Sequence, residues 1–306
     1  MLFSSFVLHG FLAFDILGGI INPTVKDRHG DLCNSDNYRP VMLSSIFLKL
    51  FEYCILSKIE HHIKLNDRQH GFRENYSTSS AGFILKEIAL NYINSKSNVY
   101  ACFIDISKAF DSVSHSLLMK KLLQYGIPAI YVNVISFWYS NQRIQVRYGS
   151  DYSDEWTICN GVRQGGVLSG LFFNIYIDSL IDKISKSKFG CKMGTVSSNI
   201  IAYADDIVLL APTPRGLQLL IDAAYDEACL LKLSFNHSKS KCLIFKYSRD
   251  KKEFGGSFLM GNSHIEVVKS FKYLGYMLNN RLINVDDIIK TRDRFYKEFN
   301  CILRKF

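Results

Sequence analysis

The stretch IIAYADDIVLL, residues 200–210, decides how this sequence is interpreted. Apolar residues lie on both sides of Asp205 and Asp206, a pattern that indicates two buried strands joined at an acidic turn. Two adjacent carboxylates raise each other's proton affinity unless a cation offsets their charge, and carboxylate oxygens suit Mg²⁺ or Mn²⁺. Taken alone, the pair indicates a metal site or a solvent-exposed Asp-Asp turn equally well.

A third aspartate follows another buried strand. Residues 99–104, VYACFI, form a short apolar run that ends at Asp105. In a split βαβ sheet the ends of neighbouring strands meet, so we expect Asp105, Asp205 and Asp206 to hold two divalent ions a few Å apart, as in-line phosphoryl transfer requires. Asp111 is a competing ligand, but its position past a turn favours a role at the start of a helix.

The segments around these strands predict an α+β domain. From residue 99 to 246 the order is strand, helix, strand, helix, strand, with a hairpin inserted at 141–159, which predicts an antiparallel sheet backed by helices on one face. The glycine-rich loop 161–166 precedes an almost wholly apolar helix at 167–184. Upstream, an amphipathic helix is expected with an apolar face of Ile46, Phe47, Leu50, Phe51, Cys54, Ile55 and Ile59.

Composition sets the class of partner. Lys and Arg outnumber Asp and Glu by 37 to 28, and the net charge of +9 favours a polyanion. A chain of 306 residues with 48% hydrophobic content predicts two or three subdomains. The eight cysteines form no C-x-x-C pair and read as buried free thiols in a reducing compartment. Residues 1–21 are mostly apolar, but Asp15 and His9 interrupt them, which favours a buried helix or strand over a membrane anchor and predicts a soluble protein.

Several blocks of sequence resemble one family. Residues 103–111 (FIDISKAFD) resemble motif A of non-LTR (LINE-type) retrotransposon reverse transcriptases, residues 161–169 (GVRQGGVLS) resemble motif B, and residues 203–206 (YADD) resemble motif C. Residues 37–40 (NYRP), 69–73 (QHGFR), 236–241 and 271–275 (FKYLG) match further blocks. Because seven blocks follow the family's order over roughly residues 20–280, coincidence does not explain the match.

The resemblance implies a right-hand polymerase with a split βαβ palm of ferredoxin-like type and mainly helical fingers. The expected division is an N-terminal segment at 1–25, fingers at 26–98, a palm at 99–255 with a fingers insertion at about 127–160, and the primer grip and start of the thumb at 256–306. The implied activity is RNA-directed DNA polymerisation, with two Mg²⁺ ions or Mn²⁺, an RNA template, a DNA primer or target DNA, and dNTPs.

The resemblance also implies roles for single residues. Asp105, Asp205 and Asp206 would bind metal, and Lys239 would protonate the pyrophosphate leaving group. The dNTP would meet Lys26, Arg39, Ile106, Phe110 and Gln164, and the primer and template would meet Arg68, Arg73, Gly165, Phe271, Leu274 and Gly275. The alternatives are structural: solvated cations, a core phenylalanine at 110, a plain strand-to-helix turn at 161–166 and a core strand at 271–275.

The chain also departs from the family pattern. Gly170 stands where the family usually has proline, and the sequence resembles a fragment without the endonuclease and most of the thumb. The alternative functions are a catalytically inactive nucleic-acid-binding fragment, an RNA-copying RNA polymerase and a nuclease. The family implies action in the nucleus with cytoplasmic assembly, although the sequence shows no clear signal. Template choice, target site, activity and oligomeric state stay open.

Overall fold

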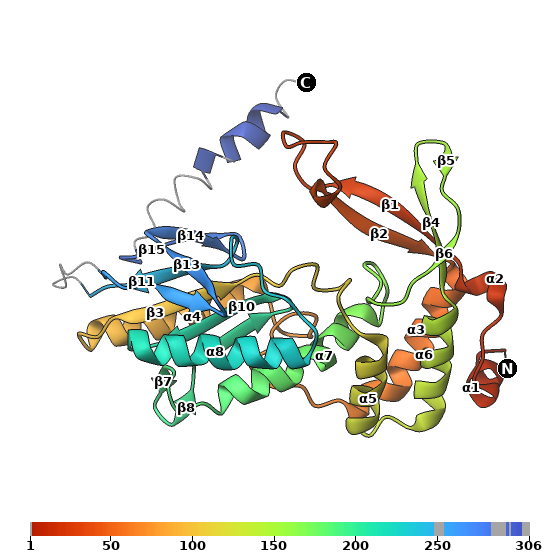
Figure 1. The fold of residues 1–306 in the computed structure, drawn as a ribbon, viewed down its shortest axis with the longest axis horizontal. Coiled ribbons are helices and arrows are strands. Elements are labelled where there is room, and N and C mark those ends of the chain that lie inside the picture. Colours follow the sequence, from red (N-terminus) through yellow and green to blue (C-terminus); the bar gives the residue numbers. More distant parts are fainter. Residues whose placement is uncertain (1, 248–253, 283–291, 294, 302–306) are drawn as a thin grey trace. The chain divides into compact units, whose positions relative to one another are not determined.

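The computed structural model describes residues 2–247, 254–282, 292–293 and 295–301 (Figure 1). The chain folds as two compact units: the first comprises Met1–Asn66, Lys108–Ser179 and Leu230–Leu233, and the second comprises Asp67–Ser107, Leu180–Cys229 and Ser234–Phe306. The division into fingers, palm and thumb start stays a prediction. Residues 248–253 of the expected palm and residues 283–291, 294 and 302–306 of the expected thumb lie outside the described residues.

The second unit contains a six-stranded sheet in the order β12-β13-β11-β3-β10-β9. Its strands are β3 (Val99–Ile104), β9 (Ile200–Tyr203), β10 (Asp206–Ala211), β11 (Lys241–Phe245), β12 (Phe258–Met260) and β13 (Ser263–Val268). β3 lies between β10 and β11 and is antiparallel to both. The order β11-β3-β10-β9, with β3 first in the chain, is the predicted split βαβ arrangement, which is confirmed.

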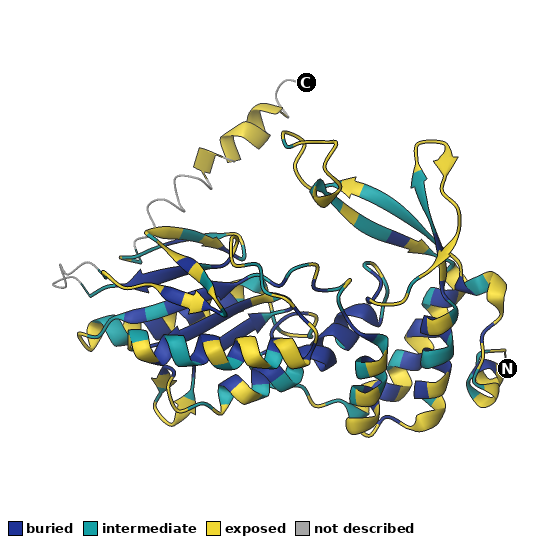
Figure 2. Ribbon diagram, viewed as in Figure 1, coloured by how far each residue is buried: buried dark blue, intermediate teal, exposed yellow. Residues whose placement is uncertain are grey.

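Both faces of this sheet are covered. Helix α4 (Thr78–Asn94) and the hairpin of β14 (Ser270–Tyr273) and β15 (Tyr276–Asn279) pack in one hydrophobic cluster with the alternate β3 residues Val99, Ala101 and Phe103. Helix α8 (Pro214–Leu230) runs across the front of the sheet in Figure 1, and the sheet is largely dark blue in Figure 2. The predicted helical layer is present, but its restriction to one face was wrong, because α4 packs on the sheet as well. A small hairpin, β7 (Lys192–Met193) with β8 (Val196–Ser197), is also part of the second unit.

The first unit combines helices with a smaller sheet of order β2-β1-β4-β5, in which β6 also pairs with β4. The strands are β1 (Gly19–Val25), β2 (Tyr38–Ser44), β4 (Arg143–Tyr148), β5 (Asp151–Tyr152) and β6 (Trp156–Thr157). The helices are α1 (Leu2–His9), α2 (Phe14–Leu17), α3 (Ile46–Ile59), α5 (His115–Gln124) and α6 (Ala129–Asn141), with short 3₁₀ turns at Ser35–Asn37 and Glu60–His62. Helix α7 (Ser169–Ser185) begins in this unit, and the chain enters the second unit within it.

The β1–β2 hairpin has no counterpart in the sequence-based expectation, which treats residues 26–39 only as a polar, turn-rich segment. Pro23 of β1 lies opposite Pro40 of β2, and two prolines in facing positions hide the pattern of a strand pair. The hairpin tolerates them because β2 is an edge strand, and β1 pairs with β4 only through Gly19, Ile20 and Ile21.

The buried face of α3 differs from the predicted one. Ile46, Phe47 and Leu50 are exposed, at 76%, 61% and 50%, whereas Glu52 is buried at 1%. The helix begins as expected, since the Ser45 side chain accepts a hydrogen bond from Leu48 N at 3.1 Å. The predicted face is correct at Phe51, Ile55 and Ile59, which are buried. It was wrong at the exposed residues, because a buried ion pair of Glu52, described below, turns the Glu52 side of the helix inward.

Two further expectations need correction. The first helix is not a buried element: Phe6 is buried, but Leu2 and Leu8 are exposed on α1. All eight cysteines are free thiols as predicted, yet only Cys102, Cys191 and Cys242 are buried, and the other five are exposed. None of the described helices has the length and apolar character to cross a membrane.

Candidate active site

Two acidic residues lie opposite each other where two neighbouring strands of the second unit's sheet meet the loops. Asp105 follows the last residue of β3, and Asp206 is the first residue of β10. Ile104 pairs with Ile207 in the antiparallel β3–β10 register, so the next register position sets Asp105 opposite Asp206. Asp205 lies in the turn between β9 and β10. The sheet therefore brings Asp105 and Asp206, which are distant in the chain, together at the ends of two internal strands.

The carboxylates affect one another's protonation. Burial raises the pKa of Asp206 to about 6, and the charges of Asp205 and Asp105 add to that rise, although Asp206 as a residue is exposed. Burial also raises the pKa of Asp205, its own backbone N–H lowers it, and the charge of Asp105 raises it further. A bound cation would stabilise the ionised form of these closely spaced carboxylates.

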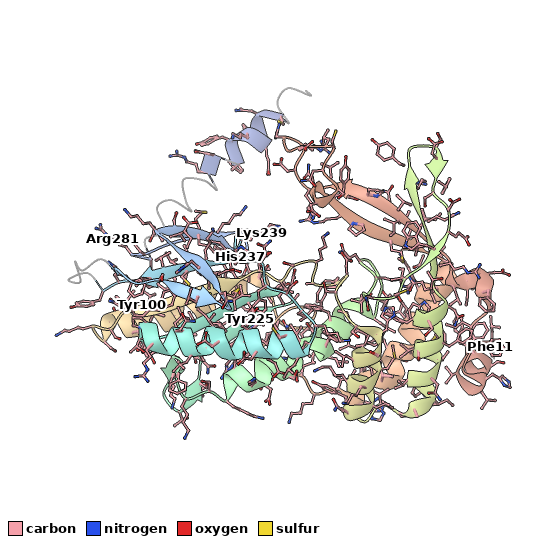
Figure 3. All side chains as sticks on the ribbon, viewed as in Figure 1. Phe11, Tyr100, Tyr225, His237, Lys239 and Arg281 are labelled. Atoms are coloured by element: carbon pink, nitrogen blue, oxygen red, sulfur yellow. The ribbon has the colours of Figure 1, made fainter. Side chains whose placement is uncertain are left out.

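The loop that carries Lys239 is hydrogen-bonded to the backbone of Asp105. Asn236 N donates to the Asp105 carbonyl at 2.8 Å, and Asp105 N donates to Ser240 Oγ at 3.1 Å. Ser240 is fully buried, and Ser240 N donates to the Asn236 carbonyl at 2.9 Å. Lys239 is exposed on this loop, where it is labelled beside His237 in Figure 3. The loop therefore fixes the end of β3 and presents a lysine beside it.

A cavity of about 380 Å³ opens beside this end of the β3–β10 ladder. It is lined by Phe103, Ile104, Asp105, Asp206, Ile207, Lys239 and residues 271–275. Two carboxylates, an ammonium group and the β14–β15 turn thus share one hollow. Phe271, Leu274 and Gly275, predicted to contact the primer, are all part of its wall.

The β14–β15 hairpin is held against β3 by aromatic rings. The Phe271 ring stacks on Phe103, with centroids 4.5 Å apart and planes at 28°. The ring centroids of Tyr273 and Phe103 are 5.3 Å apart. Tyr273 is 3% exposed, and its hydroxyl has no hydrogen-bond partner among the described residues. Burial and the nearby Asp206 charge raise the pKa of Tyr273, so this hydroxyl stays protonated.

The predicted template-contacting arginines both bind backbone oxygens within the second unit. Arg68 Nη2 donates to the Ser197 carbonyl, and Arg73 Nη1 donates to the Gln69 carbonyl at 3.1 Å. Arg73 also forms an ion pair with Asp67 at 3.6 Å, and its guanidinium lies 4.6 Å from the centroid of the Tyr76 ring. These contacts give both residues a structural role, and their contact with a template stays a prediction.

The glycine-rich loop belongs to the first unit, where two elements fix it. The Glu52 and Arg163 side chains form a buried ion pair, and Glu52 Oε2 accepts a hydrogen bond from Val167 N at 2.7 Å. On the other side, Met42 N of β2 donates to the Gln164 carbonyl at 2.9 Å. Gly165 has a φ of +108°, which other residues rarely adopt, so glycine is required there. The loop is therefore constrained on both sides, and the contact of Gln164 and Gly165 with a nucleotide or primer stays a prediction.

The other predicted nucleotide-binding residues are distributed over both units. Lys26 and Arg39 are exposed on the first unit, where Lys26 Nζ donates to the Asp36 carbonyl at 2.7 Å. The Phe110 ring stacks on Phe173, with centroids 4.8 Å apart and planes at 10°. Ile106 lies in the second unit, is 4% exposed and pairs with Phe235.

Asp111, the competing metal ligand, contacts the glycine-rich loop. Gln164 Nε2 lies 3.4 Å from Asp111 Oδ1, a long hydrogen bond. Burial raises the pKa of Asp111, while this contact and the charges of Lys108 and Lys26 lower it. Asp111 thus has partners of its own within the first unit.

The donor set at the β3–β10 edge fits hard divalent cations, because it consists of carboxylate oxygens. Asp105 and Asp206 line the cavity and would provide ligands, and Asp205 contributes charge from the adjoining turn. Among the described residues, no three His, Cys, Asp or Glu side chains already converge as a complete metal-binding cluster.

Sequence analysis missed four residues that shape these sites: Gln69, Ser240, Glu52 and Tyr273. Each is a polar or ionisable side chain buried at 3% or less. Gln69, Ser240 and Tyr273 lie inside the blocks that resemble the family, at 69–73, 236–241 and 271–275, and that resemblance was the available signal. Nothing in the local sequence distinguishes Glu52 from a solvent-exposed glutamate on a helix.

Comparison with known proteins assigns the family. The family described as reverse transcriptase (RNA-dependent DNA polymerase) matches residues 26–278, and the chain belongs to this family. The Pol polyprotein of the type-2 retrotransposable element R2DM from Drosophila melanogaster is 28% identical over 253 residues, which are 78% of this chain and 23% of that protein. The probable RNA-directed DNA polymerase from transposon BS of the same species is 29% identical, over 86% of this chain and 29% of that protein. The predicted resemblance to non-LTR retrotransposon reverse transcriptases is confirmed, and the chain spans about a quarter of the length of these relatives.

Solved structures support the fold. Apo telomerase from Candida tropicalis, truncated from its C-terminal domain, matches with a TM-score of 0.58 at 13% identity, over 88% of this chain and 54% of that one. Telomerase from the same organism, in complex with a fragment of telomeric RNA, matches with a TM-score of 0.54 at 13% identity, over 79% of this chain and 43% of that one. At this identity the likeness concerns the fold alone, and the predicted polymerase fold class is confirmed.

Proposed function

We propose that this chain is the polymerase part of a retrotransposon protein that extends a DNA primer on an RNA template. The observation that carries the proposal is the facing pair Asp105 and Asp206 at the end of the β3–β10 ladder, in one cavity with Lys239 and the β14–β15 turn. A reaction on phosphates needs both signs of charge at one place, and this hollow supplies them. Acting on target DNA would place the protein in the nucleus.

Each group has a chemical task in this proposal. Asp105, Asp205 and Asp206 would hold two Mg²⁺ ions, with Mn²⁺ as a substitute, and bound ions would offset the charge of the attacking 3′-hydroxyl and of the pyrophosphate. Lys239, which is exposed at the cavity wall, would give a proton to the leaving group. The β14–β15 turn, with Phe271 and Gly275 in the wall, would position the primer end.

Primer extension tests the proposal. Purified protein is incubated with an RNA template, an annealed DNA primer, dNTPs and Mg²⁺, and the products are separated by length. We expect extension that depends on the template and on the divalent ion. A folded protein that binds the duplex but adds no nucleotide would instead support the binding-only alternative. Cleavage without nucleotides would indicate a nuclease.

Phe110 provides a prediction about sugar selection. An aromatic ring beside the nucleotide would collide with a ribose 2′-hydroxyl, so Phe110→Ala is expected to reduce the preference for dNTP over NTP about 100-fold, or about 2.7 kcal/mol. The measurement is kcat/KM for each nucleotide type on the same template.

Phe110→Tyr is the matched control, because it keeps the ring that stacks on Phe173. It should retain the preference for dNTP. If Phe110→Ala extends with unchanged sugar selection, Phe110 is a packing residue only.

A further inference from the structure

The turn that carries Asp205 and Asp206 is hydrogen-bonded to a buried glutamine, Gln69. Gln69 has no exposed surface. Its Oε1 accepts hydrogen bonds from Ala204 N at 2.9 Å and from Gly71 N at 2.8 Å, and its Nε2 lies 3.5 Å from the Ala204 carbonyl. One side chain thus contacts both backbone polar groups of the residue that precedes the two aspartates.

The backbone on either side of Gln69 follows β9. Ala202 N donates to the Arg68 carbonyl at 2.9 Å, and His70 N donates to the Ala202 carbonyl at 2.8 Å. Gln69 and Ala202 form a parallel bridge. Residues 68–71 therefore act as a short extra strand along β9, and they end at the carboxylate turn.

The turn needs such support because of its own conformation. Ala204 has a φ of +55°, in the left-handed region that non-glycine residues adopt only when their surroundings enforce it. Gly71 packs directly against it: a Cβ at position 71 would lie 2.3 Å from Ala204 N. Any larger residue at position 71 would push the turn out of place.

We infer that Gln69 is a positioning residue for the metal-binding carboxylates. By holding Ala204 in its left-handed conformation, it sets the directions of Asp205 and Asp206 without contacting a substrate. Groups that orient metal ligands typically change metal affinity or activity 10- to 100-fold when they are replaced. The inference rests on the proposed function in that the ligand of these carboxylates is a divalent cation.

The test is Gln69→Met, which keeps the length and bulk of the side chain but removes its acceptor and donor. We expect the affinity for Mn²⁺, measured by electron paramagnetic resonance on protein without nucleic acid, to fall about 10- to 100-fold. The Mg²⁺ concentration for half-maximal primer extension should rise by a similar factor, while KM for dNTP stays within about twofold.

The matched control is Gln142→Met. Gln142 is also buried, at 2%, and its Nε2 contacts Met42 Sδ at 3.1 Å within the first unit. Both variants lose a buried polar contact, so both should melt at a lower temperature. Only Gln69→Met should lose Mn²⁺ affinity. Equal Mn²⁺ binding by Gln69→Met and wild type would overturn the inference while leaving the polymerase proposal intact.

Gly71→Ala tests the same turn from a second direction. Its added Cβ should displace Ala204 and weaken Mn²⁺ binding, whereas Gly255→Ala, where nothing lies within 4 Å of the added Cβ, should bind Mn²⁺ as wild type does. Wild-type Mn²⁺ affinity in Gly71→Ala would contradict the positioning role. If wild-type protein binds Mn²⁺ but extends no primer, the proposed function fails, and the two variants still test the role of this turn.

Discussion

Replacing Asp206 with asparagine is expected to lower the rate of primer extension at least about 1,000-fold, equivalent to about 4 kcal/mol of transition-state stabilisation. Asp206 faces Asp105 across the β3–β10 ladder and lines the cavity, so its loss removes a ligand and a charge that no neighbour replaces. Single-nucleotide incorporation at saturating Mg²⁺ measures the effect. Asp226→Asn, at an exposed position of α8, is the control and should extend at the wild-type rate.

The same substitution should make the metal-free protein more stable above pH 6. The Asp206 carboxyl titrates at about 6 in the folded protein and at 3.8 without the fold, so the unfolded chain releases this proton first as the pH rises. The carboxylate therefore costs stability that is absent below about pH 4 and complete above about pH 6. Because the residue is exposed, we expect Asp206→Asn to raise Tm by only about 2 °C at pH 8 in a chelating buffer. A lower Tm would contradict the account of repelling charges.

The second large effect is expected at Glu52. Glu52→Ala leaves the Arg163 guanidinium buried at 3% exposure without its carboxylate, a change that typically costs about 3–5 kcal/mol. The Arg163 guanidinium would retain only its position 4.2 Å from the centroid of the Trp138 ring, and Val167 N would lose its acceptor. Thermal unfolding followed by circular dichroism should show a Tm lower by about 10 °C.

An exposed ion pair of the same unit provides the control for Glu52. Arg143 and Glu155 approach to 3.9 Å with side chains 64% and 54% exposed, and such pairs contribute less than about 1 kcal/mol. Glu155→Ala should therefore shift Tm by less than about 3 °C. Similar melting temperatures for Glu52→Ala and Glu155→Ala would show that the buried pair contributes no more than a surface pair does.

The central sheet could be predicted from the sequence because its strands carry strong local signals. The runs at 99–104 and 200–210 are buried on both faces, so they are continuously apolar, and each acidic interruption marks the end of a strand. Asp105 and Asp206 could be placed together by the topology alone, since a split βαβ order puts the strands that carry them side by side.

The remaining features depend on contacts between distant residues, which no local pattern contains. The β1–β2 hairpin contains facing prolines and lacks an alternating pattern, and the α3 face is set by Arg163 of a loop far along the chain. Gln69 is inferred to hold Ala204 in a left-handed conformation, and no sequence pattern predicts that conformation for an alanine. These features depend on tertiary contacts, namely the local backbone conformation and the pairing of buried polar groups, and therefore could not be predicted from the sequence.

The position of β3 between β10 and β11 affects how readily its backbone amides exchange with solvent. Amide protons on a strand with partners on both sides exchange with solvent only when a large part of the domain opens, whereas edge strands exchange through local fraying. Asp105 directly follows β3, a strand with a partner on each side. We therefore expect local fraying of the edge strands to disturb the position of this carboxylate little.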